Sequence, residues 1–195
     1  MNLPAQTPQR IVILISGRGS NMQAIVRRCV EQRWPAQVVA VLADRPTAAG
    51  LVFALEHGIA TAVVDYKVHG DRAAFDDALA TAIDARRPDL VVLAGFMRIL
   101  GAAFVQRFEG RVLNIHPSLL PKYPGLDTHQ RALGAGDAEA GCTVHLVTSG
   151  VDEGPVLGQA RIPVRPGDTA ETLADRVKAE EHRLYPAALA KLVAG

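Results

Sequence analysis

Short apolar runs alternate with amphipathic stretches through the first half of the chain. The run over residues 10–16 is apolar at almost every position, which is typical of a strand buried on both faces. The stretch over 21–32 repeats its apolar residues at helical spacing, and Asn21 is a candidate for its N-terminal cap. The same two patterns predict strands over 37–43, 61–65, 90–94 and 112–116, and helices over 47–57 and 72–87. Strands separated by helices in this way pair in parallel, with helices on both faces of the sheet.

The pattern changes in the second half of the chain. A proline-rich loop over 116–125 leads to a short predicted helix over 128–133. Two weaker apolar runs follow, over 142–148 and 156–164, and the glycines between them indicate antiparallel strands at an edge of the sheet. The last long helix is expected to begin after a Thr169 cap and to run towards Val193.

We therefore expect an α/β fold with a mostly parallel sheet, helices on both faces and antiparallel strands at the C-terminal side. Residues 1–195 are treated as one domain, in which 1–9 form a disordered leader. The two halves of this domain are 10–108, which binds a phosphate or nucleotide, and 109–195, which carries the catalytic residues. The Leu120–Pro121 peptide bond is expected to be cis, which would shape the proline-rich loop.

Charge and cysteine content narrow the class of protein. Of 195 residues, 21 are Lys or Arg and 20 are Asp or Glu, so the net charge is +1, which argues against dependence on a nucleic-acid backbone. The longest apolar runs are too short to cross a membrane. Cys29 and Cys142 are far apart and lack the spacing of metal ligands, so no metal site is expected. Two free thiols are typical of a cytoplasmic protein.

The first candidate site is the segment Ser16 to Asn21, S-G-R-G-S-N, which joins the first strand to the first helix. Backbone N–H groups freed by glycines at the start of a helix bind anions, so a phosphate is the natural ligand. The dinucleotide fingerprint G-x-G-x-x-G is absent because Met22 stands where the third glycine would be, and no Walker A loop follows. The alternative is a tight turn without a ligand.

The second candidate is the pair Asn114 and His116, followed directly by Pro117. Residues two apart in a strand point to the same face, so the amide and the imidazole project together. They lie at the carboxyl end of a parallel strand, where open α/β sheets place their ligands. This pair is suited to stabilise an oxygen that gains negative charge while a proton moves. A buried structural histidine with an asparagine neighbour is the alternative.

A third candidate is the loop over 148–155, which holds an acidic pair between glycines. Asp152 could pair with His116 and orient it, or it could be a solvated turn residue. A hydrolase triad of Ser118, His116 and Asp152 is disfavoured, because Ser118 lies two residues from His116 across a proline. The roles of His129 and His145 stay open, since each could lie near the site, pack in the core or face solvent.

These sites, in this order, resemble the folate-dependent glycinamide ribonucleotide formyltransferases of purine synthesis. The resemblance runs from Arg10 to about Pro186. Its most specific blocks are Ser16 to Asn21, Leu93 to Leu100 (L-A-G-F-M-R-I-L), Asn114 to Gly125 (N-I-H-P-S-L-L-P-K-Y-P-G) and Val151 to Pro155 (V-D-E-G-P).

The resemblance implies a Rossmann-like formyltransferase fold and direct transfer of a formyl group from 10-formyltetrahydrofolate, a co-substrate, to glycinamide ribonucleotide. It implies Asn114, His116 and Asp152 as the catalytic residues. It implies nucleotide contacts from Gly19, Ser20, Asn21, Lys178, Ala179, Glu180 and Glu181. It implies folate contacts from Arg72, Met97, Arg98, Ile99, Leu100, Asn114, Thr148, Ser149, Gly150, Val151 and Asp152. We expect a monomer or a homodimer that binds neither nucleic acid nor membrane.

Three other functions compete with this interpretation. A formyltetrahydrofolate hydrolase would need no phosphate loop. A formylase of methionyl-tRNA would need a further RNA-binding domain and a basic surface. A nucleotide sensor on a doubly wound sheet would use Gly17 to Asn21 but would leave Asn114, His116 and Asp152 without a purpose.

Overall fold

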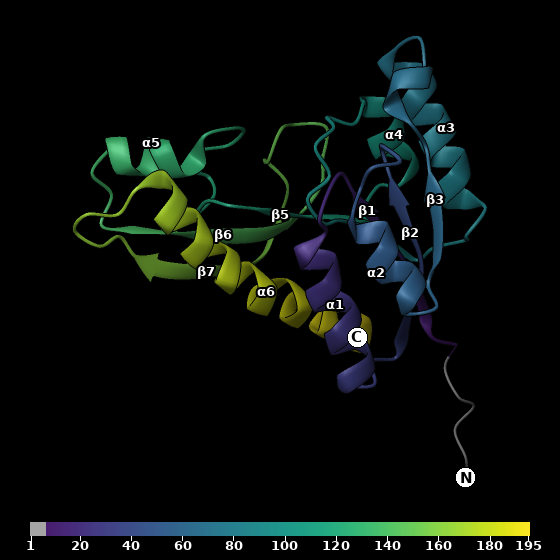
Figure 1. The fold of residues 1–195 in the computed structure, drawn as a ribbon, viewed down its shortest axis with the longest axis horizontal. Coiled ribbons are helices and arrows are strands. Elements are labelled where there is room, and N and C mark those ends of the chain that lie inside the picture. The colour runs from purple at the N-terminus through teal and green to yellow at the C-terminus, as the bar shows by residue number, and fades with distance from the viewer. Residues whose placement is uncertain (1–6) are drawn as a thin grey trace.

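Seven strands form one sheet, in the order β3-β2-β1-β4-β5-β6-β7, in the computed structural model, which describes residues 7–195 (Figure 1). They are β1 (Gln9–Ile15), β2 (Ala36–Ala43), β3 (Ala60–Val63), β4 (Leu90–Leu93), β5 (Val112–His116), β6 (Glu139–Leu146) and β7 (Val156–Pro163). The first five strands pair in parallel, whereas β6 is antiparallel to both β5 and β7. The predicted fold class is confirmed, including the antiparallel strands at the C-terminal side.

Helices cover both faces of this sheet. They are α1 (Ser20–Glu31), α2 (Gly50–Glu56), α3 (Arg72–Asp84), α4 (Ala102–Arg107), α5 (Thr128–Gly134) and α6 (Ala170–Ala194), with a short 3₁₀ helix, η1 (Tyr66–Val68). Thr169 caps α6 as predicted, and its hydroxyl accepts the Thr172 N–H. No helix within residues 7–195 is long and apolar enough to cross a bilayer.

Two predicted helices are shorter than the pattern indicated, and two elements were not predicted. The helix over 47–57 begins only at Gly50, because the residues before it form a turn in which the Ala48 N–H donates to the Arg45 carbonyl. The helix over 72–87 ends at Asp84, since Pro88 disfavours helical backbone at Arg87, which has a φ of 48°. The unpredicted elements, α4 and η1, are too short to show a periodic pattern.

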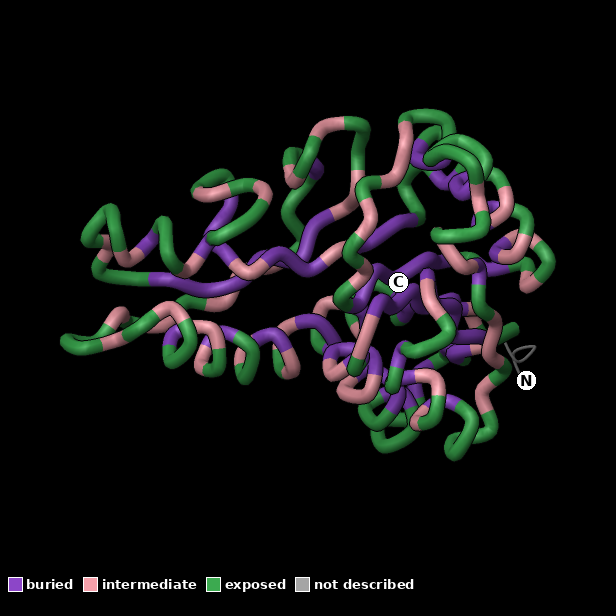
Figure 2. The backbone as a smooth tube through the Cα atoms, turned by 45° about the horizontal axis from the view of Figure 1, so that its top comes forward, coloured by how far each residue is buried: buried purple, intermediate pink, exposed green. Residues whose placement is uncertain are grey.

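β1 builds the cores on both faces of the sheet. Ile11, Ile13 and Ile15 pack in the core under α1, α2 and α6, whereas Val12 and Leu14 pack in the core under α3 and α4. All five side chains are fully buried, and each contributes about 1.5–3 kcal/mol to folding. The central strands are therefore buried, as the purple segments in the middle of Figure 2 show.

The order in which the strands are added to the sheet reverses between β1 and β4. After β1 the chain builds β2 and β3 on one side, and then it returns to build β4 and β5 on the other. Open α/β sheets bind ligands outside the carboxyl ends of the strands at such a reversal. The loops after β1, β4 and β5 all begin at this edge (Figure 1).

The helices and strands test only part of the predicted division of the domain. Of the predicted leader over 1–9, residues 1–6 lie outside the described part of the chain, and Gln9 already belongs to β1. The sheet runs without interruption through both predicted halves, because β4 pairs with β5. The functional division at 108/109 stays a prediction. The Leu120–Pro121 bond is cis, as expected.

The Tyr185 side chain joins α6 to β4 and β5. Its side chain is fully buried, and its hydroxyl lies 3.2 Å from the Leu93 carbonyl oxygen and 3.0 Å from that of Leu113. Burial, followed by the nearby Glu181 charge, raises the pKa of Tyr185 well above its usual value, so the hydroxyl keeps its proton to donate.

Tyr185→Phe should lower the free energy of unfolding by about 1–2 kcal/mol, because two buried carbonyls lose their shared donor without a change in packing. Urea unfolding measures this difference, and the m-value should stay constant. An unchanged midpoint would show that the hydroxyl adds no net stability.

Candidate active site

The segment 16–21 forms a tight loop between β1 and α1. Gly19 stands directly before α1 with a φ of 67°, a conformation that glycine adopts without steric cost. The backbone of Gly50 lies against the same loop. Its N–H donates to the Gly17 carbonyl at 3.0 Å, and a Cβ at this position would lie 2.7 Å from the Cδ1 of Ile15. The first N–H groups of α1 have no partner within the helix, an arrangement that fits the predicted anion site, which stays a prediction.

Asn21 does not cap α1, contrary to the prediction. Gly19 takes the cap position, so Asn21 lies inside the first turn and its side chain reaches α6. Its Nδ2 donates to the Glu181 Oε2 at 2.8 Å in a buried contact. Burial raises the pKa of Glu181, although the hydrogen bond from Asn21 lowers it. Among residues 7–195, the buried Oδ1 of Asn21 has no hydrogen-bond partner.

The structure thus joins two of the predicted nucleotide contacts, Asn21 and Glu181. The other predicted residues of α6 are less enclosed. Lys178 and Ala179 are exposed, and Glu180 accepts a hydrogen bond from Arg183 at 2.7 Å.

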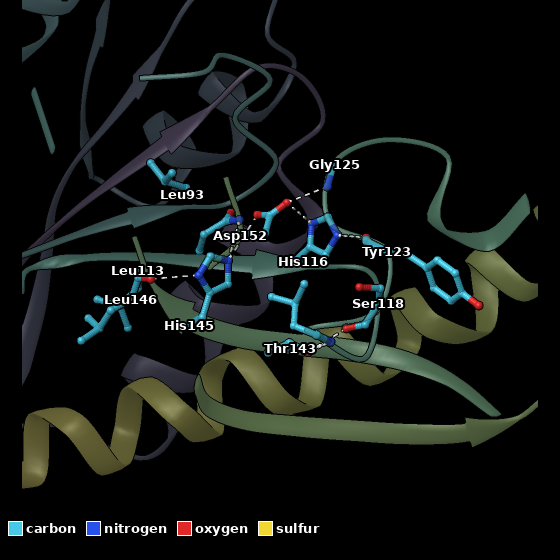
Figure 3. Close-up of polar contacts among 12 residues, drawn as sticks. Leu93, Leu113, His116, Ser118, Tyr123, Gly125, Thr143, His145, Leu146 and Asp152 are labelled. Carbon is cyan, nitrogen blue, oxygen red and sulfur yellow. Dashed lines mark hydrogen bonds and ion pairs between the residues drawn. The ribbon is translucent and has the colours of Figure 1, made fainter. Parts of the chain in front are cut away.

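Asp152 and two histidines converge beside the carboxyl end of β5 (Figure 3). The Oδ2 of Asp152 lies 3.2 Å from the Nδ1 of His116, and its Oδ1 lies 3.5 Å from the Nε2 of His145. Both histidines are buried. Asn114 completes the cluster, because its Nδ2 lies 3.2 Å from the same Nε2 of His145. The predicted trio of Asn114, His116 and Asp152 therefore shares one site.

His116 has an oxygen opposite each ring nitrogen. Its Nε2 lies 2.8 Å from the Tyr123 carbonyl, which can only accept, so this nitrogen carries a proton. Its Nδ1 faces the Asp152 carboxylate. Both ring nitrogens of His116 therefore face an oxygen that can accept a hydrogen bond.

His145 is the member of the site that sequence reasoning left open. In the β5–β6 ladder it stands directly opposite Asn114. Its Nδ1 donates to the Leu146 carbonyl at 2.9 Å, so in the neutral ring Nε2 accepts from the Asn114 Nδ2. This contact orients the amide and leaves its second N–H for another oxygen. Only the register of the antiparallel ladder could have revealed the pairing.

Asp152 is held as a carboxylate by its donors. Burial raises its pKa, but the contact with His145, a hydrogen bond from the Gly125 N–H and the charge of His116 lower it by more. The Gly125 N–H lies 2.9 Å from Oδ2. Asp152 has a φ of 57°, which costs about 1–3 kcal/mol for a non-glycine residue. The carboxylate is thus aimed at the histidines by a strained turn.

The hydrolase alternative with Ser118 as nucleophile is wrong. The Ser118 hydroxyl donates to the Lys122 carbonyl at 2.6 Å and not to His116. Its carbonyl accepts from Thr143 at 2.7 Å, so the residue shapes the start of the proline-rich loop.

The predicted folate residues lie in two loops and at one helix start. Met97 and Ile99 are exposed, at 69% and 68%, in the loop after β4, and Arg98 and Leu100 are half-buried. Arg72 lies in the first turn of α3, near Asp76, whose Oδ2 accepts from the Gly101 N–H at 2.7 Å. Burial raises the pKa of Asp76 by more than the Gly101 hydrogen bond and the charge of Arg72 lower it. The other residues, Thr148, Ser149, Gly150 and Val151, form an open loop leading to Asp152. Within residues 7–195, no group of three or more His, Cys, Asp or Glu side chains could hold a metal ion.

Comparison with known proteins identifies the family of this chain. The model of the family described as formyl transferase matches residues 9–189. This chain belongs to the formyl transferase family.

Three relatives of this formyl transferase that match it over most of their own length are the following. The phosphoribosylglycinamide formyltransferase of Escherichia coli is 51% identical over 176 residues, covering 90% of this chain and 83% of that protein. The crystal structure of phosphoribosylglycinamide formyltransferase from Brucella melitensis is 55% identical, with a TM-score of 0.91 and coverage of 96% and 97%. Glycinamide ribonucleotide transformylase 1 from Symbiobacterium toebii is 48% identical, with a TM-score of 0.93 and coverage of 98% and 92%.

Gly154→Ala should disturb the acid–histidine cluster of this formyl transferase. A Cβ there would lie 1.7 Å from the Leu146 carbonyl oxygen, which also fixes the tautomer of His145. We expect a loss of about 1–3 kcal/mol of stability and a change in the ¹⁵N shifts of the His145 ring by NMR.

The matched control is Gly134→Ala, because Gly134 has open space around its Cβ position and no positive φ. It should leave both the stability and the ring shifts close to those of the unmodified protein. An unchanged His145 spectrum in Gly154→Ala would contradict the role of the Leu146 carbonyl.

Proposed function

We propose that this chain transfers the formyl group of 10-formyltetrahydrofolate to the amine of glycinamide ribonucleotide, yielding formylglycinamide ribonucleotide and tetrahydrofolate. The observation that carries the proposal is the cluster of Asn114, His116 and Asp152 at the edge of the sheet from which the 16–21 loop also leaves. The activities named for the relatives agree with this reaction.

The reaction needs stabilisation of an oxyanion. The amine of the nucleotide attacks the formyl carbon, and the carbonyl oxygen gains negative charge. The free N–H of Asn114 and an N–H of protonated His116 donate to this oxygen, and a donor of this kind lowers the barrier by about 3–4 kcal/mol. To reach the substrate, the Nε2 of His116 must exchange its contact with the Tyr123 carbonyl for one with the substrate oxygen.

Asp152 supports the charge on His116. The carboxylate stays ionised because its donors lower its pKa, and it stabilises the imidazolium across 3.2 Å. A water molecule carries the proton from the attacking amine to the leaving folate nitrogen. The formyl carbon passes directly between the two substrates, and no residue becomes covalently modified.

Different groups of residues bind the two substrates. Gly19, Ser20 and Asn21 hold the phosphoribosyl end of the nucleotide, with Lys178 to Glu181 of α6 beside them. The buried Oδ1 of Asn21, which lacks a partner in the described chain, is available to a ligand donor. Arg72, the 97–100 loop and the 148–152 loop border the folate.

Asn114→Ala and His116→Ala should each lower kcat for formyl transfer roughly 100- to 1,000-fold, because each removes one donor to the oxyanion. Steady-state assays of tetrahydrofolate release measure this effect, and circular dichroism checks the fold. Asp152→Ala should also lower kcat, since His116 loses its counter-charge. Near-normal kcat in His116→Ala would refute the assigned role.

Two assays separate transfer from the rival functions. The protein is mixed with 10-formyltetrahydrofolate, with and without glycinamide ribonucleotide. Release of tetrahydrofolate only in the presence of the nucleotide supports transfer. Release without the nucleotide would indicate a hydrolase, and no release in either mixture would indicate a nucleotide sensor.

A further inference from the structure

Asp44 is a buried carboxylate that none of the catalytic steps above uses. It directly follows β2, on the opposite side of β1 from the Asn114–His116–Asp152 cluster, and its side chain is completely buried. Removing a charge from water costs several kcal/mol unless partners compensate. The groups that compensate the Asp44 charge therefore indicate which part of the structure the carboxylate holds in place.

Two arginines compensate the charge, and they do so unequally. The Nε of Arg98 donates to the Asp44 Oδ2 at 2.6 Å, whereas the Nε of Arg45 lies 3.3 Å from Oδ1. The Arg98 side chain is 27% exposed and that of Arg45 is 42% exposed. Arg98 therefore makes the shorter and better shielded contact, although it lies far away in the sequence, in the loop after β4.

Asp44 also places an aromatic ring against Arg98. The Asp44 carbonyl accepts the Tyr66 N–H at 3.0 Å, and the Arg98 guanidinium lies 4.0 Å above the centre of the Tyr66 ring. The guanidinium is thus held by a carboxylate at one edge and by an aromatic face below. Within residues 7–195, Nε is the only guanidinium nitrogen of Arg98 with a hydrogen-bond partner, so both terminal NH₂ groups are available to a ligand.

A second path runs from Asp44 through Ser16 to the same loop. Ser16 lies close enough to Asp44 to lower the pKa of that carboxyl, and the Ser16 Oγ accepts the Met97 N–H at 2.8 Å. The Ser16 N–H also donates to the Gly95 carbonyl at 3.0 Å. Asp44 therefore reaches the 95–100 loop both through the Arg98 side chain and, by way of Ser16, through the backbone.

We propose that Asp44 is a positioning residue that fixes the 95–100 loop, and Arg98 within it, for binding of the folate co-substrate. This inference rests on the proposed function for the identity of the ligand. Burial raises the pKa of Asp44, but its three side-chain hydrogen bonds lower it by more, so the group remains a charged acceptor. Because Asp44 lies across β1 from the reacting atoms, its loss should weaken folate binding without slowing the chemical step.

Asp44→Asn keeps the shape of the side chain and removes its charge. We expect the KM for 10-formyltetrahydrofolate to rise about tenfold or more, as for loss of a charge-assisted buried hydrogen bond, while kcat stays within about twofold. A general loss of structure would lower kcat as well. Unchanged folate KM, or a fall in kcat alone, would overturn the proposal.

A double-mutant cycle tests whether Asp44 acts through Arg98. In an Arg98→Met background, Asp44→Asn should raise the folate KM by less than about twofold, since the group that it positions is already gone. If the two effects instead multiply in full, Asp44 does not act through Arg98. Arg45→Met is the matched control, because it removes the other guanidinium on the same carboxylate and should change folate KM little.

A readout that needs no activity separates this inference from the proposed function. Hydrogen exchange at the Met97 amide should be faster in Asp44→Asn than in the unmodified protein, whichever substrate the enzyme uses. If the unmodified protein fails to transfer formyl groups, the proposed function falls, while faster exchange still supports the positioning role. Should Asp44→Asn not fold, Arg98→Met carries the test, and unchanged Met97 exchange there overturns the proposal.

Discussion

The register between β5 and β6 is the constraint on which the candidate active site depends. It sets Asn114 directly opposite His145, and the hydrogen bond across this pair orients the Asn114 amide. Side chains alternate between the faces of a sheet, so a shift of β6 by one residue would turn His145 to the other face, away from Asn114. Gly154 holds the connection that follows β6, because its backbone lies against the Leu146 carbonyl.

Around this pair, the polar side chains are oriented by backbone groups. The Tyr123 and Leu146 carbonyls each accept a hydrogen bond from one histidine ring, and the Gly125 N–H donates to one oxygen of Asp152. Backbone groups move less than side chains, so these contacts hold the side chains in place before a substrate arrives. Such preorganisation is the main source of electrostatic stabilisation in enzymes.

A second polar cluster, around Asp44, lies on the side of β2. There Asp44 ties the start of the 16–21 loop to the loop after β4, through Ser16 and Arg98. The 16–21 loop contains residues proposed to bind the nucleotide, and the 95–100 loop contains residues proposed to bind the folate. The buried Asp44 carboxylate therefore connects the two loops. The residues proposed for catalysis at β5 and the residue proposed for positioning at β2 thus lie on either side of the same sheet reversal.

The sequence by itself determined the alternation of strands and helices, the tight loop over 16–21 and the shared face of Asn114 and His116, because these depend on local periodicity and on glycine positions. Tertiary structure alone decided that Asp152 reaches His116, that His145 joins them and that Asn21 turns to Glu181 instead of capping α1. These contacts join residues that are distant in the chain. Local sequence fixes which way a side chain points, whereas the register and packing of remote segments fix what it meets.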